Sequence, residues 1–429
     1  MKFAFFTLGC KVNLFETQAL EQLAQARGHT IVPRGADAVI VNTCTVTSVS
    51  DRKNIRAFHK LRRDNPNAVI AACGCFAQTD PDRVRAGGEV DLVCGTRDRA
   101  MVIALCEQAV GGNDVPAYAP QDETTFEFLP AGVPDGRTRA LLKIEDGCSN
   151  FCTYCIIPYA RGRVRSMLPE QAAAEVDRLA RQGVHEIVLT GIEITSYGRD
   201  LTPPISLTAL LCDLLAAQPA VRFRLGSLDP RIIDDAFCER LRGFDNLARH
   251  FHLSLQSGCD SVLRRMGRRY TTAAYLARVQ QLREAFPDCS ITTDLIVGFP
   301  GETEEEFSQT LAFLQSCGFA AVHVFPFSVR EGTRAAQMDG QLPAEVKAER
   351  AARAGQVAAS LSEAYRARFI GRTLAALPEH RSGEFWASHG DYGFPIYIEG
   401  GGLQKNRPVR VRATALCRDG LRAEFLQEV

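Results

Sequence analysis

Two groups of cysteines in this 429-residue chain have a spacing that could support chemistry. The first is a compact Cys-x3-Cys-x2-Cys loop made by Cys148, Cys152 and Cys155. Three thiols in one short loop cannot all be packing residues, and structural zinc sites prefer four closed ligands. Three thiolates suit a cubane iron–sulfur cluster that leaves one iron open for a further ligand. The loop therefore favours such a cluster over zinc.

The second group comes from three separate segments. Cys10, Cys44 and Cys75 each follow an apolar run that predicts a strand of a parallel sheet. The carboxyl ends of such strands share one edge, where ligands bind, so we expect the three thiols to converge there. Cys73 competes for the third position, but it lies within its strand, whereas Cys75 follows the turn residue Gly74. The alternative is that all three are buried packing residues.

The elements around these cysteines predict an α/β chain in three parts. In residues 1–120, strands alternate with amphipathic helices, which is typical of a parallel α/β domain. The expected strands are residues 3–8, 38–43, 68–72 and 91–94. The expected helices lie near residues 13–27, 48–63, 81–86 and 97–110. Residues 111–136 are rich in Gly, Pro and acidic residues, and we interpret them as a linker.

The middle part, residues 137–368, repeats the alternation on a larger scale. Six βα units predict a partial parallel (β/α)6 barrel. The expected strands are residues 139–144, 186–190, 222–225, 251–255, 291–297 and 321–325. A long helix is expected at residues 342–368, and residues 303–306 form a capping box for another helix. Residues 371–429 have short segments and Gly-rich breaks, which predict a small antiparallel β-domain.

Composition limits the class of protein. The chain has 50 basic and 50 acidic residues, with 46% hydrophobic and 23% charged residues, the balance of an ordinary globular protein. No apolar run approaches the roughly 18 residues that a membrane span needs, so we expect no membrane partner. Residues 1–8 are expected to form a strand rather than a signal peptide, in a cytoplasmic protein. In that reducing compartment, 15 cysteines favour metal or cluster ligands over disulfides.

With an aromatic residue before its last cysteine, the Cys148–Cys155 loop resembles that of the radical S-adenosylmethionine (SAM) enzymes, whose fold is a full or partial βα barrel. The whole chain is similar to the methylthiotransferase family, which joins a three-cysteine domain, a radical SAM barrel and a TRAM-like RNA-binding β-domain. Supporting stretches lie at residues 189–198, 252–260, 266–271 and 294–303. The run Thr7-Leu8-Gly9-Cys10-Lys11-Val12-Asn13 resembles the MtaB group, which acts on N6-threonylcarbamoyladenosine in tRNA.

The resemblance implies two 4Fe–4S clusters and SAM as cofactors. Cys148, Cys152 and Cys155 would hold the cluster that chelates SAM, and an unidentified, flavodoxin-like donor would supply an electron. The resulting 5′-deoxyadenosyl radical would abstract hydrogen from C2 of adenine 37 in the tRNA anticodon stem-loop. Cys10, Cys44 and Cys75 would hold the cluster that carries the inserted sulfur, and a second SAM would supply the methyl group.

Three alternatives stay open at this point. Other groups of the family methylthiolate isopentenyladenosine in tRNA or modify a ribosomal protein. The third alternative is a non-catalytic RNA-binding protein that carries iron–sulfur or zinc. Metal analysis separates this last class from the first two.

Further candidate residues follow from their positions. Glu193 lies past the second barrel strand and could meet the SAM amino group, while Gln256 and Asp294 could meet SAM or the nucleoside. Arginines beside an aromatic residue, Tyr270, suit RNA backbone contact with base stacking, although a solvated helix face has the same pattern. The RNA-binding candidates are Arg264, Arg265, Arg268, Arg269, Lys405, Arg407, Arg410 and Arg412.

Overall fold

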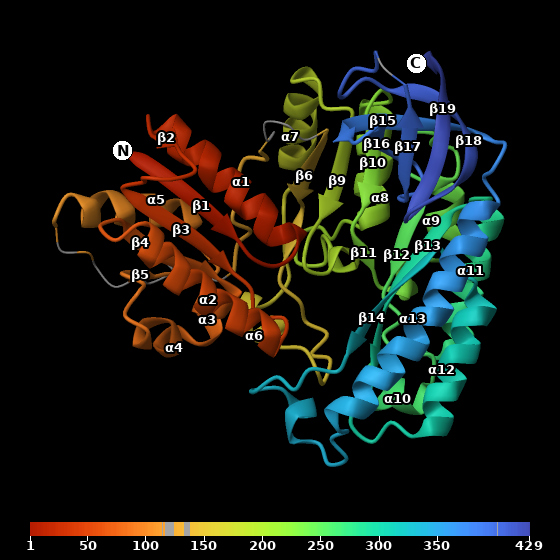
Figure 1. The fold of residues 1–429 in the computed structure, drawn as a ribbon, viewed down its shortest axis with the longest axis horizontal. Helices are drawn as coiled ribbons and strands as arrows, with labels where there is room; N and C mark the ends of the chain where they lie inside the picture. Colours follow the sequence, from red (N-terminus) through yellow and green to blue (C-terminus); the bar gives the residue numbers. More distant parts are fainter. Residues whose placement is uncertain (114, 116–123, 133–137, 401) are drawn as a thin grey trace.

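The N-terminal sheet of the computed structural model is parallel throughout, in the order β2-β1-β3-β4-β5 (Figure 1). The structure describes residues 1–429 except 114, 116–123, 133–137 and 401. The strands are β1 (Lys2–Thr7), β2 (Thr30–Ile31), β3 (Ala38–Thr43), β4 (Val69–Gly74) and β5 (Leu92–Val93). The helices are α1 (Lys11–Ala26), α2 (Ser48–Asp64), α3 (Cys75–Thr79), α4 (Pro81–Ala86) and α5 (Arg99–Val110). The four predicted strands are confirmed, and the two-residue β2 is an addition to them.

Side chains alternate across this sheet, because successive residues of a strand point to opposite faces. Ile40 packs in a core with residues of α1 and α5. Its neighbours Val39 and Val41 pack in another core with Phe58 of α2 and Phe76 of α3. Both faces of the sheet are therefore covered by helices, as the continuous apolar strands predicted.

The middle of the chain forms the predicted partial barrel. Its six main strands are β6 (Arg139–Lys143), β9 (Glu186–Thr190), β10 (Arg222–Leu225), β12 (His250–Leu253), β13 (Ser290–Val297) and β14 (Ala321–Pro326). Neighbouring strands pair in parallel, and a parallel bridge from Phe223 to Leu247 joins β10 to the segment before β12. The short β11 (Ser227–Leu228) extends this junction, and β7 (Glu145–Asp146) pairs with β8 (Arg165–Ser166).

Helices lie between and after these strands. They are α6 (Ile157–Arg161), α7 (Pro169–Arg181), α8 (Leu207–Ala217), α9 (Asp235–Leu241), α10 (Asp260–Arg265), α11 (Thr272–Ala285), α12 (Glu304–Cys317) and α13 (Ala344–Ala367). Three 3-10 turns, η1 (Ile194–Ser196), η2 (Pro230–Ile232) and η3 (Arg334–Gln337), lie in the loops. The predicted capping box is present at the start of α12, where Thr303 and Glu306 bond reciprocally.

The first part of the chain and the barrel share a core. Phe15 and Ala19 of α1 are buried with Leu142 of β6 in one hydrophobic cluster. Leu129 and Ala131 are buried in the same cluster, so this part of the expected linker is packed against the barrel. Residues 114, 116–123 and 133–136 of the expected linker lie outside the described residues.

The C-terminal part is a closed five-stranded barrel in the order β15-β16-β17-β19-β18. The strands are β15 (Thr373–Ser382), β16 (Phe385–Gly390), β17 (Pro395–Glu399), β18 (Val409–Cys417) and β19 (Gly420–Glu428). The expectation of a wholly antiparallel domain is wrong at one place, because β17 and β19 pair in parallel to close the barrel. Period-two alternation cannot distinguish these two pairings, since it gives the faces of a strand and not its direction.

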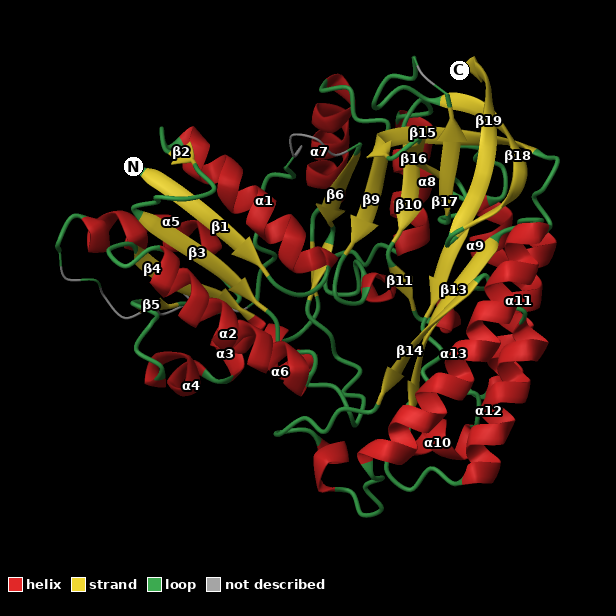
Figure 2. Cartoon of the chain, in the orientation of Figure 1, coloured by secondary structure: helices red, strands yellow, loops and turns green. Residues whose placement is uncertain are grey.

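The carboxyl ends of both parallel sheets lead toward the middle of the molecule. In Figure 2 the arrowheads of β1 and β3 point toward the same central region as those of β6 and β9. The loops that carry chemistry are expected at this edge. None of the helices in the described ranges is long and apolar enough to cross a membrane.

Candidate cluster and substrate site

The three N-terminal cysteines lie at three adjacent strand ends. Cys10 caps the start of α1, Cys44 directly follows β3, and Cys75 opens α3 after β4. At Gly9, φ is +112°, and an added Cβ would lie 2.7 Å from Cβ of Cys44. The absence of a side chain at Gly9 therefore lets the Cys10 turn approach Cys44 closely.

Burial and neighbouring charges set the state of these thiols. Burial raises the pKa of Cys75 to about 11, with Arg161 opposing and Cys10 adding to the shift. Burial also raises the pKa of Cys44, to which Cys10 contributes again. Cys10 therefore lies within electrostatic reach of both other thiols. Cys73, by contrast, is fully buried in the hydrophobic core that contains Leu20 and Val102.

The Cys148–Cys155 loop leaves the barrel after β7 and is anchored at its centre. The backbone N–H of Thr153 donates to the carbonyl of Met266 at 3.0 Å, and its hydroxyl donates to the carbonyl of Arg265 at 2.8 Å. Burial raises the pKa of Cys148 to about 12 and that of Cys155 to about 11. Without a metal, the thiols of Cys148 and Cys155 are therefore protonated at neutral pH, and a metal must displace their protons to bind.

Hydrogen-bond donors already point at the sulfurs of this loop. The N–H of Asn150 lies 3.5 Å from Sγ of Cys148, and a guanidinium nitrogen of Arg268 lies 3.5 Å from Sγ of Cys152. Such donors stabilise thiolate charge, which a cluster ligand carries. The donor set therefore fits an iron–sulfur cluster.

The spacing of the thiols fits the same conclusion. Among the residues that the structure describes, neither cysteine triplet has all its sulfurs within 4.8 Å of one another. Ligands about 2.3 Å from a single zinc ion would be within about 4 Å of each other. A cubane cluster holds its thiolates farther apart because each binds a different iron.

A buried ionic network joins the two cysteine groups. Glu16 of α1 lies 2.9 Å from a guanidinium nitrogen of Arg99 and 3.2 Å from Nζ of Lys143, and it also pairs with Arg161. Asp146 lies 3.1 Å from Nζ of Lys143. Burial raises the pKa of Glu16, but Arg161, Arg99 and Lys143 outweigh it and lower the pKa to about 2. Glu16 is therefore ionised and holds the barrel loop against the N-terminal sheet.

A cavity of about 280 Å³ lies between these parts of the chain. Its wall combines residues after Cys44, the second cysteine loop, the barrel strands and the segment after β14. Among the lining residues are Val46, Thr47, Tyr154, Cys155, Gln256, Asp294, Phe327 and Ser328. Ser328 of this wall is hydrogen-bonded to Ser48, with their hydroxyls 3.0 Å apart. The cavity thus brings three predicted site residues, Cys155, Gln256 and Asp294, to one place beside the segment that follows Cys44.

Glu193 lies next to the cysteine loop rather than in this cavity wall. Its backbone N–H donates to the carboxylate of Glu145 at 2.7 Å, and one of its own carboxylate oxygens accepts from Ser196. The other oxygen, Oε1, is buried and has no hydrogen-bond partner in the described part of the chain. Burial raises the pKa of Glu193, and its charge adds to the raised pKa of Cys148. An orphaned carboxylate oxygen at this position fits a cationic amino group as its partner.

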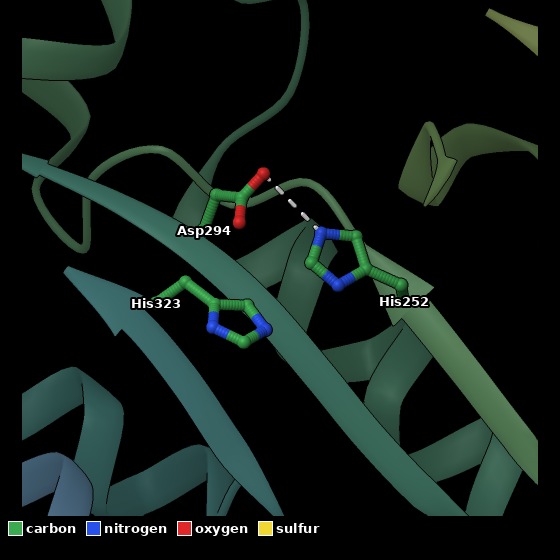
Figure 3. Close-up of side chains that lie close together, drawn as sticks. All are labelled: His252, Asp294 and His323. Atoms are coloured by element: carbon green, nitrogen blue, oxygen red, sulfur yellow. Dashed lines mark ion pairs between the residues drawn. The ribbon is translucent and has the colours of Figure 1, made fainter. Parts of the chain in front are cut away.

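Asp294 of β13 lies close to two histidines from the neighbouring strands, His252 of β12 and His323 of β14 (Figure 3). Its Oδ2 lies 3.4 Å from Nε2 of His252, and the backbone of β13 pairs Asp294 with His323 on β14. Gln256 follows β12 with φ of +71°. Its backbone N–H donates to the carbonyl of Asp294, and its carbonyl accepts from the N–H of Ile296. Gln256 thus lines the cavity in a left-handed backbone conformation.

The predicted RNA-binding arginines fall into two environments. Arg264 and Arg269 are exposed. The side chain of Arg268 is only 9% exposed, stacks on Tyr270 and contacts Cys152, and Arg265 pairs with Glu306 at 2.6 Å. In the C-terminal barrel, the exposed members of the predicted set are Lys405, Arg407, Arg410 and Arg412. RNA contact stays a prediction for all of them. Arg268 also contacts the cysteine loop, where its guanidinium group can stabilise the sulfur of Cys152.

Sequence reasoning missed the charged residues that hold the cysteines in place. Arg161, Glu16 and Glu145 carried no motif, since a charged residue in a helix or after a strand usually faces solvent. One signal was available for two residues near Cys10. Asn13 lies three residues after Cys10, and Glu16 lies three residues after Asn13, so each of these two pairs has a spacing that makes neighbours on a helix surface.

Comparison with known proteins agrees with this site. Residues 142–314 match the radical SAM superfamily, and residues 2–95 match the uncharacterized protein family UPF0004. In fold, the chain is similar to the radical SAM methyltransferase TsrM from Kitasatospora setae, with a TM-score of 0.57 at 14% identity over 75% of this chain and 72% of that one. It is also similar to the cobalamin-dependent radical enzyme OxsB, with a TM-score of 0.52 at 12% identity over 81% and 56% of the two chains.

Relatives found by sequence comparison have a higher identity to this chain than these two structures. The threonylcarbamoyladenosine tRNA methylthiotransferase MtaB of Bacillus subtilis is 40% identical over 88% of this chain and 84% of its own length. The protein of the same name from Thermotoga maritima is 38% identical over 87% and 85%. A tRNA-2-methylthio-N(6)-dimethylallyladenosine synthase from Caldicellulosiruptor saccharolyticus is 36% identical over 80% and 75%. The chain therefore belongs to the radical SAM tRNA methylthiotransferases, transferases that use SAM and two 4Fe–4S clusters.

Proposed function

We propose that this protein inserts a methylthio group at C2 of N6-threonylcarbamoyladenosine at position 37 of tRNA, in the anticodon stem-loop. The observation that carries the proposal is the 37–40% identity to three relatives named for this substrate, over 84–86% of their lengths. Relatives named for dimethylallyladenosine are 34–36% identical over 73–75% of theirs. The run from Thr7 to Asn13 favours the same substrate.

Each cysteine group has its own role in this proposal. Cys148, Cys152 and Cys155 hold the cluster that binds SAM, and Cys10, Cys44 and Cys75 hold the second cluster. When bound, the first cluster supplies one-electron reductive cleavage of SAM, and the second supplies the sulfur atom for transfer. An electron donor of the flavodoxin type supplies the electron.

The residues of the chain orient the cofactor and substrate and exclude water. Glu193, with its orphaned buried oxygen, accepts a hydrogen bond from the amino group of SAM. Arg268 and Asn150 stabilise the sulfurs of the cysteine loop. The 280 Å³ cavity beside Cys155 receives the adenine, and the segment after Cys44 brings the second cluster to the same space. Placing both reacting groups in one cavity is the main contribution that a protein makes to such a reaction.

The test is a nucleoside analysis of bulk tRNA from a strain that lacks this protein. We expect the methylthio form of threonylcarbamoyladenosine to disappear and threonylcarbamoyladenosine itself to accumulate. The methylthio form should return when the gene for this chain is supplied on a plasmid. A plasmid carrying Cys152→Ala is the matched control. Loss of methylthio-isopentenyladenosine instead would identify the neighbouring substrate, and unchanged tRNA would favour a ribosomal protein.

A further inference from the structure

A second cavity inside the barrel is lined by charged side chains, most of which have no role in binding the clusters or SAM. It has a volume of about 360 Å³, within the size range of ligand sites, and lies between the barrel strands and the C-terminal domain. Residues from α1, β6, β10, β12, β13 and β14 line it, among them Lys11, Arg139, Arg224, His252, Asp294 and His323.

Three basic side chains meet at this cavity. Nε of Arg139 lies 3.0 Å from Oε1 of Glu379, and Nε of Arg224 lies 2.7 Å from Oε1 of Glu186, so both guanidinium groups are fixed. The amino group of Lys11 lines the same space but forms no hydrogen bond or ion pair with any described residue. An anionic ligand that enters this cavity could therefore form an ion pair with Lys11.

The side chains that line this cavity contribute little negative charge. Asp294 is the one carboxylate among the described residues that line it, and His252 lies 3.4 Å from its Oδ2. Ligand atoms of His252, Asp294 and His323 lie within 4.8 Å of one another, a geometry that a metal ion could use (Figure 3). Lys11 has no ion-pair partner among the described residues, and the ion-paired Arg139 and Arg224 lie beside it, an arrangement that disfavours a divalent metal ion and attracts an anion. The charge of the cavity therefore favours an anionic ligand.

The position of Asp294 connects this cavity to the reaction centre. Asp294 also lines the 280 Å³ cavity, together with Cys155 and Gln256. A nucleobase in that first cavity, with the carbon to be modified toward the cysteine loop, can extend a substituent past Asp294 into the second. The two cavities thus suit the two ends of a modified adenine.

We propose that the second cavity binds the carboxylate of the threonylcarbamoyl substituent, with Lys11 as its direct ion-pair partner and Arg139 and Arg224 as supporting cations. This inference rests on the proposed function and deepens it. The hydroxyl or carbamoyl N–H of the same substituent can donate to Asp294. An isopentenyl group offers neither charge nor hydrogen bonds, so the charged groups at this cavity discriminate against it. The site selects the open threonylcarbamoyl form, because cyclisation consumes the free carboxylate.

The experiment uses reconstituted full-length protein and three anticodon stem-loop RNAs. They carry threonylcarbamoyladenosine, its cyclised form or isopentenyladenosine. Binding and methylthiolation are measured for wild type, Lys11→Gln, the charge-retaining Lys11→Arg and Lys60→Gln. Lys60 is an exposed lysine of α2 that lines neither cavity and serves as the matched control. Iron content is measured in every sample, since Lys11 adjoins Cys10.

Wild-type protein should bind the open form about tenfold or more tightly than the cyclised form, as expected when a charge-assisted hydrogen bond is removed. Lys11→Gln should remove most of that difference by weakening binding of the open form alone, and Lys11→Arg should restore much of it. Equal wild-type affinity for both forms, or an unchanged ratio in an iron-loaded Lys11→Gln variant, would overturn this proposal alone. Wild-type activity confined to isopentenyladenosine would overturn the proposed function together with it.

Discussion

Nε of Arg161 donates to Sγ of Cys75 across a distance of 3.2 Å, so a buried guanidinium at the end of α6 contacts a thiol of the N-terminal sheet. The same guanidinium donates to Oδ1 of Asn13 at 2.8 Å. The amide nitrogen of Asn13 in turn donates to the carbonyls of Leu8 and Thr43 at 2.7 and 2.9 Å. One arginine therefore connects the loops of Cys10, Cys44 and Cys75 to the helix that follows Cys155.

Replacing Arg161 should disturb the N-terminal cluster and spare the other. In Arg161→Met, we expect iron to fall from about eight to about four atoms per chain, because each cubane cluster holds four. Iron analysis and electron paramagnetic resonance of the anaerobically reconstituted protein measure this. Arg163→Met, at an exposed position two residues on, is the matched control. An Arg161→Met protein with full iron and normal product would show that the Arg161–Cys75 hydrogen bond is dispensable.

The two cysteine groups should separate the two halves of the reaction. Cys152→Ala should abolish reductive cleavage of SAM, since the proposed cluster at that loop binds it. Cys44→Ala should retain this cleavage and lose sulfur insertion. Chromatography of 5′-deoxyadenosine and of the tRNA nucleosides measures both steps, with Cys212→Ala, outside both groups, as control. Methylthio product from Cys44→Ala would exclude the second cluster as the sulfur source.

Glu193→Gln should weaken SAM binding. Oε1 of Glu193 is buried without a partner among the described residues, and a neutral amide there loses the charge that attracts an ammonium group. We expect the Kd for SAM to rise about tenfold, the size of one charge-assisted hydrogen bond. Equilibrium dialysis of the iron-loaded protein measures the affinity, and the exposed Glu170→Gln is the control. An unchanged Kd would assign Glu193 to the support of the loop alone.

The sequence predicted the strands and the cysteine positions well, for a physical reason. Parallel strands must be apolar along their length and place their loops at one edge, so both the sheet and the convergence of Cys10, Cys44 and Cys75 follow from local patterns. Arg268 could not be predicted in the same way. A run of arginines looks identical whether it faces solvent or, as here, one member folds back onto Tyr270 and Cys152.

Long-range packing accounts for the other differences. Burial of Phe15 of α1 in the barrel core depends on how two parts of the chain meet, and no local pattern records it. The parallel pairing of β17 with β19 depends likewise on closure of the C-terminal barrel. The fold also brings Glu16 and Lys143 together in the interior, 3.2 Å apart, and no local pattern in the sequence records this pairing.

Glu16→Gln should destabilise the protein strongly. It leaves Arg99, Lys143 and Arg161 buried with one carboxylate fewer, and breaking a buried ion pair in this way costs about 3–5 kcal/mol. Thermal unfolding of the iron-free proteins at neutral pH should show a lower midpoint for the variant, with Glu170→Gln as control. Because the pKa of Glu16 is lowered from 4.5 to about 2, its contribution is complete above pH 4.5 and is lost as the pH falls toward 2. Equal midpoints at neutral pH would contradict a stabilising network.

The exposed arginines of the α10 region should contribute to tRNA affinity. The double variant Arg264→Gln/Arg269→Gln should bind tRNA more weakly and with a shallower salt dependence, by about 0.7–0.9 in the logarithmic slope for each phosphate group that the protein no longer neutralises. Filter binding over a range of salt concentrations measures the slope. Arg181→Gln, on the exposed face of α7, is the control. A wild-type slope in the double variant would place the RNA elsewhere.

Competition between two substrates tests the proposed function most directly. Reconstituted protein, SAM and reductant are mixed with equal amounts of anticodon stem-loops carrying threonylcarbamoyladenosine or isopentenyladenosine at position 37, and the nucleosides are analysed by mass spectrometry. We predict a 2-methylthio product from the threonylcarbamoyl RNA, accompanied by 5′-deoxyadenosine, with the isopentenyl RNA left unchanged. Product from the isopentenyl RNA alone would contradict the proposed substrate and the carboxylate site at Lys11.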